Sequence, residues 1–374
     1  MSLKSSKYPF FKNLKPSLKK ISKYVPGESE DKNNNRIIKL SSNESPFTLS
    51  KKILLNISTK LKNCNRYPDG DCRIIKNALV KKFNLNSKQI ICGNGSDDIL
   101  ALICNAFSRE NTEVICSNYG FIYYPVVAYA SGAKVVNAKT KNLSVSTSNI
   151  LKKITKNTKI IFIANPNNPT GSIIFKDELI KFLKKVPKKI IIVLDGAYAE
   201  YIDDKRFSDG LDLVRKYPNI VITRTFSKIF GIAGLRLGWA YSSKEVIELM
   251  EKIRGPFNVN TIAQVAASEI LSDESFLEKS IKHNDKTKQW LSTELKNLGL
   301  NVIESYTNFL LVKTNKNQMS AKDIVERLKE KGILVRGLEN YKLPNFFRVS
   351  LGKKEELKVF IDYLSKILKG GKKY

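Results

Sequence analysis

Histidine is nearly absent, since the 374 residues of this chain include only His283. That residue lies in a lysine-rich stretch with a helical pattern. A Ser-His-Asp triad is therefore all but excluded, as is a metal site built on several histidines, and we expect no metal. The chain also lacks a CxxC pair, and its odd number of cysteines argues against a disulfide framework or a zinc site. We interpret the five cysteines as small buried or half-buried thiols: Cys64, Cys72, Cys92, Cys104 and Cys116.

Long apolar stretches are missing as well. No run approaches the roughly 18 apolar residues that a membrane-spanning helix needs. The first 20 residues also lack the apolar segment of a secretory signal. We therefore expect no membrane partner and a cytoplasmic location. With 374 residues, the chain exceeds the size at which one hydrophobic core stops growing, so two structural domains are expected.

Acidic residues are few: 35 Asp and Glu accompany 65 Lys and Arg, which gives a formal net charge of +30. Such an excess is typical of proteins that bind nucleic acids or anionic membranes. Here the lysines are spread through the whole chain beside abundant Ile and Asn, and Arg, the usual reader of bases and phosphates, is scarce by comparison. We interpret the charge as a compositional bias and expect no nucleic-acid partner. A basic nucleic-acid-binding protein on an enzyme-like scaffold is the rival hypothesis from another class.

Apolar runs of strand length alternate with helical patterns through the first two thirds of the chain. Buried strands are expected at residues 89–92, 113–116, 133–137, 159–164, 189–194, 219–223 and 239–241. This alternation predicts an α/β fold with a mostly parallel seven-stranded sheet flanked by helices, together with a smaller α+β domain. The expected divisions are an N-terminal arm at residues 1–42 that packs on the small domain, a large domain at 43–256, and the small C-terminal domain at 257–374.

Polar side chains follow three of these strands where each one ends. They are Asn165, Asp195 and Lys228. Because ligands bind at the carboxyl ends of strands in open α/β sheets, we expect these side chains to converge on one crevice. A lysine beside a carboxylate suits an amine that forms an imine with an aldehyde cofactor, while the acid keeps the cofactor's ring nitrogen protonated. Taken singly, Asp195 could be a helix N-cap and Lys228 a solvated lysine.

A glycine-rich turn at residues 93–98 joins a strand to a helix, and the free N–H groups of that helix could face a phosphate. Asp97 and Asp98 count against an anion there unless their side chains point away, and Ser96 could be a plain N-cap. Thr225, Ser227 and Arg236 could form a second phosphate cradle, because a guanidinium grips oxygens in pairs. Alternatively, Arg236 is an ordinary charge at a strand edge.

Together these residues resemble a known family, the fold-type I pyridoxal-phosphate aminotransferases, and within it the histidinol-phosphate aminotransferase group. The likeness covers residues 24–352. Its motifs are Tyr24-Val25-Pro26-Gly27, Ser42-Asn43-Glu44-Ser45-Pro46, Arg66-Tyr67-Pro68-Asp69, the turn at 93–98, Tyr119-Gly120-Phe121-Ile122-Tyr123-Tyr124, Asn165-Pro166-Asn167-Asn168-Pro169-Thr170-Gly171, Asp195-Gly196-Ala197-Tyr198, Thr225-Phe226-Ser227-Lys228, Gly234-Leu235-Arg236-Leu237-Gly238, Pro256-Phe257-Asn258-Val259-Asn260 and Phe347-Arg348-Val349-Ser350.

The resemblance implies that the large domain binds pyridoxal 5'-phosphate. Lys228 would carry it as a Schiff base and move the proton between the substrate and the cofactor. Asp195 would pair with the ring nitrogen, Asn165 and Tyr198 would bind the ring hydroxyl, and Phe121 would lie against the ring. The phosphate would be held by Gly95, Ser96, Asp97, Thr225, Ser227 and Arg236.

The resemblance also implies a homodimer with shared active sites, in which Tyr67 reaches a phosphate in the neighbouring subunit. Arg348 would clamp the substrate α-carboxylate. Tyr24, Asn43 and Arg336 would line the substrate side, with Arg336 as the candidate for a substrate phosphate. Other readings stay open: Tyr24 and Phe121 as packing aromatics, Arg336 as a surface charge, and Asn43 as a turn cap.

The implied reaction transfers an amino group between glutamate/2-oxoglutarate and histidinol phosphate/imidazole-acetol phosphate, in histidine synthesis. An aromatic or broad-specificity aminotransferase and a phosphothreonine decarboxylase of the same fold are the alternatives. The chain departs from the group's pattern at Ser45, where Asn is usual, and at Gly70, where Pro is common. The residues before Phe121 also differ, so the ring-stacking role could pass to Tyr119.

Overall fold

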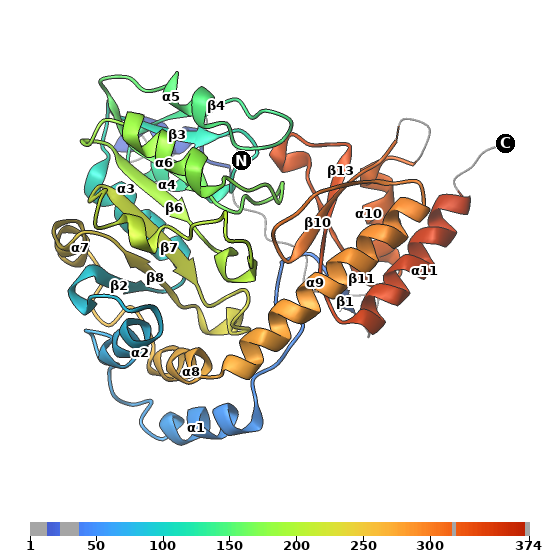
Figure 1. The fold of residues 1–374 in the computed structure, drawn as a ribbon, viewed down its shortest axis with the longest axis horizontal. Helices are drawn as coiled ribbons and strands as arrows, with labels where there is room; N and C mark the ends of the chain where they lie inside the picture. Colours follow the sequence, from blue (N-terminus) through green and yellow to red (C-terminus); the bar gives the residue numbers. More distant parts are fainter. Residues whose placement is uncertain (1–12, 23–36, 316–318, 371–374) are drawn as a thin grey trace.

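The structure is a computed structural model that describes residues 13–22, 37–315 and 319–370 (Figure 1). Its larger sheet has seven strands in the order β2-β8-β7-β6-β5-β3-β4. The strands are β2 (Ile90–Gly93), β3 (Glu113–Ser117), β4 (Lys134–Ala138), β5 (Thr158–Ala164), β6 (Ile191–Asp195), β7 (Ile220–Thr225) and β8 (Gly238–Tyr241). Only β8 runs antiparallel to its neighbours, which confirms the predicted mostly parallel sheet.

Helices cover both faces of this sheet, and each face has its own apolar core. The central strands β5 and β6 are rich in Ile and Val and almost wholly buried, as expected for strands with helices on both sides. One face packs against α3 (Ser96–Phe107), α4 (Tyr123–Ala130) and α7 (Lys244–Glu251). The other packs against α1 (Lys51–Leu61), α2 (Arg73–Phe83), α5 (Thr147–Leu151), α6 (Lys176–Lys185) and α8 (Thr261–Leu271).

A second, antiparallel sheet of four strands has the order β12-β13-β10-β9. Its strands are β9 (Asn301–Ile303), β10 (Phe309–Lys313), β12 (Arg336–Gly337) and β13 (Phe346–Ser350). Apolar side chains of α9 (Glu274–Asn297), α10 (Ala321–Glu330) and α11 (Lys354–Gly370) pack with this sheet into one core. We call this part the small-sheet region and the part around the larger sheet the large-sheet region.

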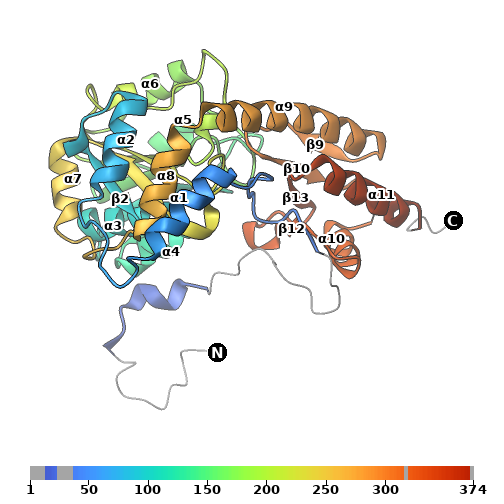
Figure 2. The ribbon, with the colours of Figure 1, turned by 90° about the horizontal axis from the view of Figure 1, so that it is seen from below.

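The packing changes within α9 rather than at residue 256, where the sequence placed the domain boundary. Apolar residues of α8, among them Ala263, Ala266 and Ile270, pack into the same core as Trp239 of the larger sheet. Farther along α9, Leu291 and the residues that follow it join the core of the small-sheet region. Helix α9 therefore runs from one region to the other (Figures 1 and 2).

The predicted N-terminal arm divides between the two regions. β1 (Ile38–Lys39) pairs in parallel with β11 (Ile333–Leu334), and Leu40 is fully buried in the core of the small-sheet region. The short 3₁₀ helix η3 (Pro16–Lys20) lies instead against α4, where Lys15 Nζ donates to the carbonyl oxygen of Ala130 at 3.2 Å. The expectation that the whole arm packs on the small domain is thus wrong for residues 13–22.

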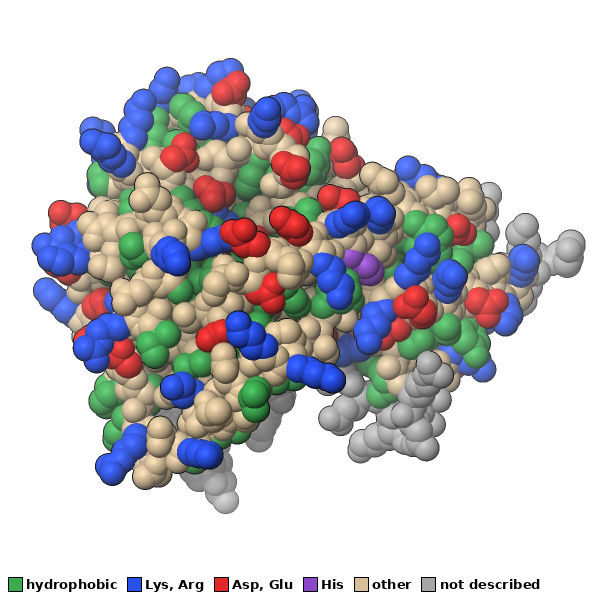
Figure 3. Space-filling view, turned by 60° about the horizontal axis from the view of Figure 1, so that its bottom comes forward, with side chains coloured by type: hydrophobic (Ala, Val, Ile, Leu, Met, Phe, Trp, Pro, Cys, Tyr) green, Lys and Arg blue, Asp and Glu red, His purple; other side chains and the backbone are tan. Residues whose placement is uncertain are grey.

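Charged side chains are dispersed over the face shown in Figure 3, where Lys and Arg alternate with Asp and Glu and form no continuous basic stripe. Within the described ranges, no helix has the length and apolar character needed to cross a membrane. In the same ranges, no cluster of three or more His, Cys, Asp or Glu side chains is arranged to hold a metal ion.

Candidate active site

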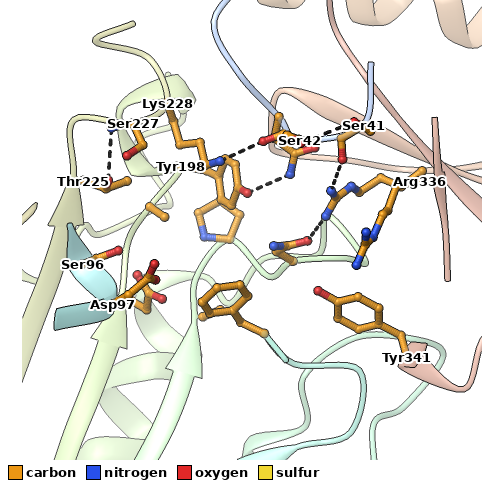
Figure 4. Close-up of a pocket in the computed structure, with 18 of the residues that line it drawn as sticks. Ser41, Ser42, Ser96, Asp97, Tyr198, Thr225, Ser227, Lys228, Arg336 and Tyr341 are labelled. Atoms are coloured by element: carbon orange, nitrogen blue, oxygen red, sulfur yellow. Dashed lines mark hydrogen bonds between the residues drawn. The ribbon is translucent and has the colours of Figure 1, made fainter. Parts of the chain in front are cut away.

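A cavity lies between the two regions, at the carboxyl ends of β5, β6 and β7 (Figure 4). This edge of a parallel sheet is where ligands bind in open α/β folds. The small-sheet region closes the other side of the cavity with Arg336 of β12, Arg348 of β13 and Tyr341 of η8 (Glu339–Tyr341). Residues 41–43, which follow β1, complete the wall.

Asp195 is the last residue of β6, and its carboxylate is buried at the floor of the cavity. Its Oδ2 accepts a hydrogen bond from the Tyr124 hydroxyl at 2.8 Å, and its Oδ1 accepts one from Thr223 Oγ1 at 3.0 Å. Tyr124 is itself held by stacking on Phe162, with 4.6 Å between the ring centroids. Burial raises the pKa of Asp195, although both hydrogen bonds oppose that shift.

Lys228 lies in the turn that follows β7, and its side chain lines the cavity between Ser42 and Tyr198 (Figure 4). Lys228 Nζ donates to the carbonyl oxygen of Ser42 at 3.1 Å and lies 5.9 Å from the centroid of the Tyr198 ring. Burial lowers the pKa of Lys228 to about 8, and the positive charge of Arg348 acts in the same direction. At pH 7 about a tenth of this amine is therefore neutral, far more than for a solvated lysine.

One end of the cavity is built to receive an anion. Arg236, at a backbone φ of 57°, donates to Ser227 Oγ at 3.0 Å and pairs with Asp97 Oδ2 at 3.3 Å. A Cβ at Gly95 would lie 2.3 Å from Arg236 Nη2, and one at Gly238 would lie 2.3 Å from the Ser96 backbone nitrogen. Glycine at both positions lets the guanidinium, the end of β8 and the N-terminus of α3 converge. A guanidinium, hydroxyls and free helix N–H groups are a donor set that fits a phosphate.

The opposite wall carries two arginines on adjacent strands. Arg336 and Arg348 are directly paired residues of β12 and β13. Arg348 is buried and donates to the carbonyl oxygen of Ser41 at 2.9 Å and to Asn168 Oδ1. Because side chains of paired residues lie on the same face of a sheet, this wall concentrates positive charge and favours an anionic ligand.

Asn43 connects Ser350 on this wall to Tyr198, which follows β6 of the larger sheet. It is buried at a φ of 55°, and its Nδ2 donates to the Tyr198 hydroxyl at 2.9 Å. Its backbone N–H donates to Ser350 Oγ at 2.8 Å, and its Oδ1 accepts from the same hydroxyl. Burial raises the pKa of Tyr198 to about 12, so this phenol stays protonated.

Comparisons with known proteins agree with this geometry. The family model for aminotransferase class I and II matches residues 35–364. A curated histidinol-phosphate aminotransferase from Pelagibacter ubique (strain HTCC1062) is 42% identical over 349 residues, which cover 93% of this chain and 97% of that protein. The chain belongs to the aminotransferase class I and II family.

Solved structures give the same result. The crystal structure of a histidinol-phosphate aminotransferase from Sinorhizobium meliloti, in complex with pyridoxal-5'-phosphate, has a TM-score of 0.88 at 25% identity and covers 96% of this chain and 98% of its own. An L-threonine-O-3-phosphate decarboxylase from Porphyromonas gingivalis has a TM-score of 0.78 at 22% identity and covers 89% and 100%, a likeness that shows the fold alone. The protein is an aminotransferase that uses pyridoxal 5'-phosphate.

Most of the residues predicted for this aminotransferase site line the cavity. The structure brings together Asn43, Ser96, Asp97, Phe121, Asp195, Tyr198, Thr225, Ser227, Lys228, Arg236, Arg336 and Arg348. Phe121 therefore holds the place beside the floor of the cavity. The alternative for ring stacking, Tyr119, packs with Leu311 in a separate apolar cluster.

Asn165 is predicted to bind the ring hydroxyl, but it does not line the cavity in this structure. Both ends of its carboxamide are occupied by Ile174: Nδ2 donates to the carbonyl oxygen at 3.0 Å, and Oδ1 accepts from the N–H at 2.8 Å. Asn168, from the same Asn-Pro-Asn-Asn-Pro motif, lines the cavity and contacts Arg348 instead. The motif contains three asparagines within four positions, and spacing from the strand end selected the wrong one.

Two further predicted residues are not among the described residues that line the cavity. Tyr67 is 82% exposed and stacks on Phe257, with 4.6 Å between centroids, so it does not line the cavity of its own chain. Tyr24 falls outside the described residues.

Several residues that line or support the site had no role predicted from the sequence: Ser41, Ser42, Tyr124, Asn168 and Tyr341. A backbone carbonyl contact such as that of Ser42 leaves no signal in side-chain chemistry. Tyr124 was available as an aromatic next to Phe121, but only the fold shows that its hydroxyl reaches Asp195.

Proposed function

We propose that this aminotransferase exchanges an amino group between glutamate/2-oxoglutarate and histidinol phosphate/imidazole-acetol phosphate, as a step of histidine synthesis. Relatives that cover more than 90% of the chain carry the name histidinol-phosphate aminotransferase. One observation in the structure carries the proposal: a single cavity holds a half-buried amine, a buried carboxylate and an anion cradle at one end, and two paired arginines at the other.

The residues of the large-sheet region fit pyridoxal 5'-phosphate. Asp195 would face the ring nitrogen, Tyr198 and Asn168 the ring hydroxyl, and Phe121 one face of the ring. The phosphate would lie among Ser96, the backbone of Gly95 and Asp97, and the side chains of Thr225, Ser227 and Arg236. When bound, the cofactor supplies an electron-withdrawing ring that stabilises negative charge at the substrate's α-carbon.

Lys228 is the residue to which we assign covalent attachment of the cofactor and proton transfer at the substrate's α-carbon. An amine whose pKa is about 8 can act both as a base and, once protonated, as an acid near neutral pH. Its hydrogen bond to the Ser42 carbonyl and its position over the Tyr198 ring keep the amine on one side of the cavity.

Arg348 and Arg336 would bind the anionic groups of the two substrates. Arg348 is buried and oriented by Ser41 and Asn168, so we assign it the α-carboxylate of glutamate. Arg336 is half-buried beside Tyr341, and we assign it the substrate phosphate. An anion between the two guanidinium groups would offset the repulsion that paired like charges create.

We also propose a homodimer in the cytoplasm. Large apolar side chains are exposed on α1 and α2, which both pack against α8, and at residues 253–257: Leu54, Leu55, Leu61, Ile74, Ile253 and Phe257. Phe257 stacks on the exposed Tyr67. An exposed apolar surface of this kind indicates a protein contact. In a dimer, Tyr67 would reach the phosphate of the partner's cofactor. A monomer at micromolar concentration in sedimentation velocity would contradict this assignment.

The test of the function uses the cofactor's absorbance. Purified protein, given glutamate, is expected to convert its cofactor to the amino form, and imidazole-acetol phosphate is expected to restore the original spectrum. Restoration by aromatic keto acids at equal efficiency would favour a broad-specificity aminotransferase, and release of carbon dioxide without a keto acid would favour a decarboxylase. Borohydride reduction followed by peptide mapping is expected to fix the cofactor on Lys228; labelling of another lysine would contradict the site.

A further inference from the structure

Two carboxylates lie in the first turn of α3, Asp97 and Asp98, where the helix presents free N–H groups to the anion cradle. A helix N-terminus attracts a phosphate, but it attracts nearby carboxylates for the same reason. A phosphate can bind there only if both acidic side chains are held in other contacts. Asp97 pairs with Arg236, at the edge of the cradle itself.

Asp98 is turned away from the cradle by two donors. Its Oδ2 accepts from the Asn94 N–H at 2.9 Å and from Asn258 Nδ2 at 2.8 Å. A Cβ at Gly93 would lie 3.0 Å from that same oxygen, so a glycine at the end of β2 leaves space for the carboxylate. Unlike Asp97, Asp98 does not line the cavity.

Asn258 is fixed in the orientation that this contact requires. Its Oδ1 accepts from Arg254 Nη1 at 2.7 Å, which leaves Nδ2 directed at Asp98. Arg254 is anchored in turn, because its Nη2 donates to the Gly70 carbonyl oxygen at 2.9 Å and its Nε donates to Glu251. The side chain of Asn258 therefore bridges the phosphate turn to the loop that carries Tyr67.

We propose that Asn258 is a positioning residue for the cofactor phosphate, which acts by holding the Asp98 carboxylate away from the N-terminus of α3. The proposal rests on the proposed function, because it takes pyridoxal 5'-phosphate as the ligand of the cradle. Without the Asn258 amide, Asp98 loses one of its two hydrogen-bond donors and its charge is free to rotate toward the helix N-terminus. The bound phosphate then meets a competing carboxylate.

The experiment compares two ligands that differ only in the phosphate. Pyridoxal 5'-phosphate and pyridoxal are titrated into the full chain after removal of its cofactor, and binding is followed by absorbance. Asn258→Ala is expected to weaken binding of pyridoxal 5'-phosphate about tenfold, the effect of losing one hydrogen bond to a charged group, and to leave pyridoxal binding unchanged. The matched control is Asn149→Ala, which removes one side-chain hydrogen bond to Lys139 far from the cavity and should change neither affinity.

A second substitution, which removes the charge of Asp98, tests whether that carboxylate causes the weaker binding in Asn258→Ala. Asp98→Asn keeps an oxygen that can accept from the Asn94 N–H, so adding it to Asn258→Ala is expected to restore the affinity for pyridoxal 5'-phosphate. Equal losses for both ligands, or no restoration, would overturn the proposal. If Asn258→Ala does not fold, Asn258→Ser carries the same expectations. A wild-type chain that binds neither ligand would instead refute the proposed function.

Discussion

The two sides of the cavity are built in different ways. The cofactor side, formed by Asp195, Ser227, Lys228 and Arg236, comes from the ends of neighbouring strands and the turns beside them. The contacts of Asp195 with Tyr124 and Thr223, and of Arg236 with Ser227, lie within the large-sheet region. The substrate side comes from three distant segments: residues 41–43, η8 with Arg336, and Arg348. It exists only where the small-sheet region meets the larger sheet. We therefore expect mutations on the cofactor side to affect the chemical step and those on the substrate side to affect the choice of substrate.

The largest expected effect is on the cofactor side. Lys228→Ala removes the amine that transfers the proton at the α-carbon, so turnover is expected to fall by about 10⁴-fold or more in steady-state assays. The thermal unfolding midpoint should not fall, because burial of the charged amine destabilises the folded protein. Lys181→Ala, at an exposed position of α6, is the control and should retain full activity. Substantial turnover by Lys228→Ala would contradict its assignment.

On the substrate side, substitutions of the two arginines should each impair a different half-reaction. Arg348→Gln is expected to lower kcat/KM for glutamate about a hundredfold, through loss of charged hydrogen bonds to the carboxylate. Arg336→Gln is expected to lower kcat/KM for histidinol phosphate by a similar factor and to change that for glutamate little. Single-turnover spectra of each half-reaction measure both values. Equal losses for both substrates in both variants would show that the arginines form one undivided anion site.

A steric change at the anion cradle should have a smaller effect. Gly95 has a φ of 87°, and a Cβ there would lie 2.3 Å from Arg236 Nη2. Gly95→Ala is expected to destabilise the protein by about 1–2 kcal/mol and to weaken cofactor binding. Gly234→Ala is the matched control, because no heavy atom lies within 4 Å of its Cβ. Chemical denaturation measures the free energy of unfolding of both variants. Equal values would show that the backbone and Arg236 accommodate the added Cβ without loss of stability.

The difference between the two sides of the cavity also explains which parts of the fold and the site could be predicted from the sequence. All seven predicted strands of the larger sheet are present, with bounds shifted by at most two residues at any end. Buried parallel strands read as continuous runs of Ile and Val, and they place Asp195 and Lys228 at one edge by topology alone. The cofactor side was therefore accessible from periodicity and spacing.

The substrate side could not be predicted from periodicity and spacing, because no local sequence pattern shows which distant segments meet in the fold. Arg336 and Arg348 were named only through a family resemblance, and Ser42 contributes a backbone carbonyl. Asn168 was missed although its neighbour Asn165 was chosen, because a loop's direction after a strand depends on tertiary contacts such as those of Ile174. The boundary near residue 256 failed for a related reason: α8 packs its small residues on the large-sheet core.

The last prediction tests whether the two sides are electrostatically independent. Arg348 lowers the pKa of Lys228, after burial, while Glu44 and Asp97 oppose this shift. Attachment of pyridoxal 5'-phosphate requires the neutral amine, so its rate on cofactor-free protein should rise with pH and level off above about 8. Arg348→Gln removes a positive charge and should move that midpoint to higher pH, with a several-fold slower attachment at pH 7.

The free energy of unfolding of the cofactor-free protein should also depend on pH, above about pH 8. Because the pKa of Lys228 falls from 10.5 to about 8 on folding, the unfolded chain binds more protons between those values. Lys228 therefore makes stability rise with pH in that window, and its destabilising contribution is fully present below about pH 8. Denaturation of wild type and Lys228→Met isolates this contribution, and Arg348→Gln should narrow the window from its lower end. If Arg348→Gln leaves this pH range unchanged, burial alone sets the pKa of Lys228, and the charge of Arg348 does not act on the amine.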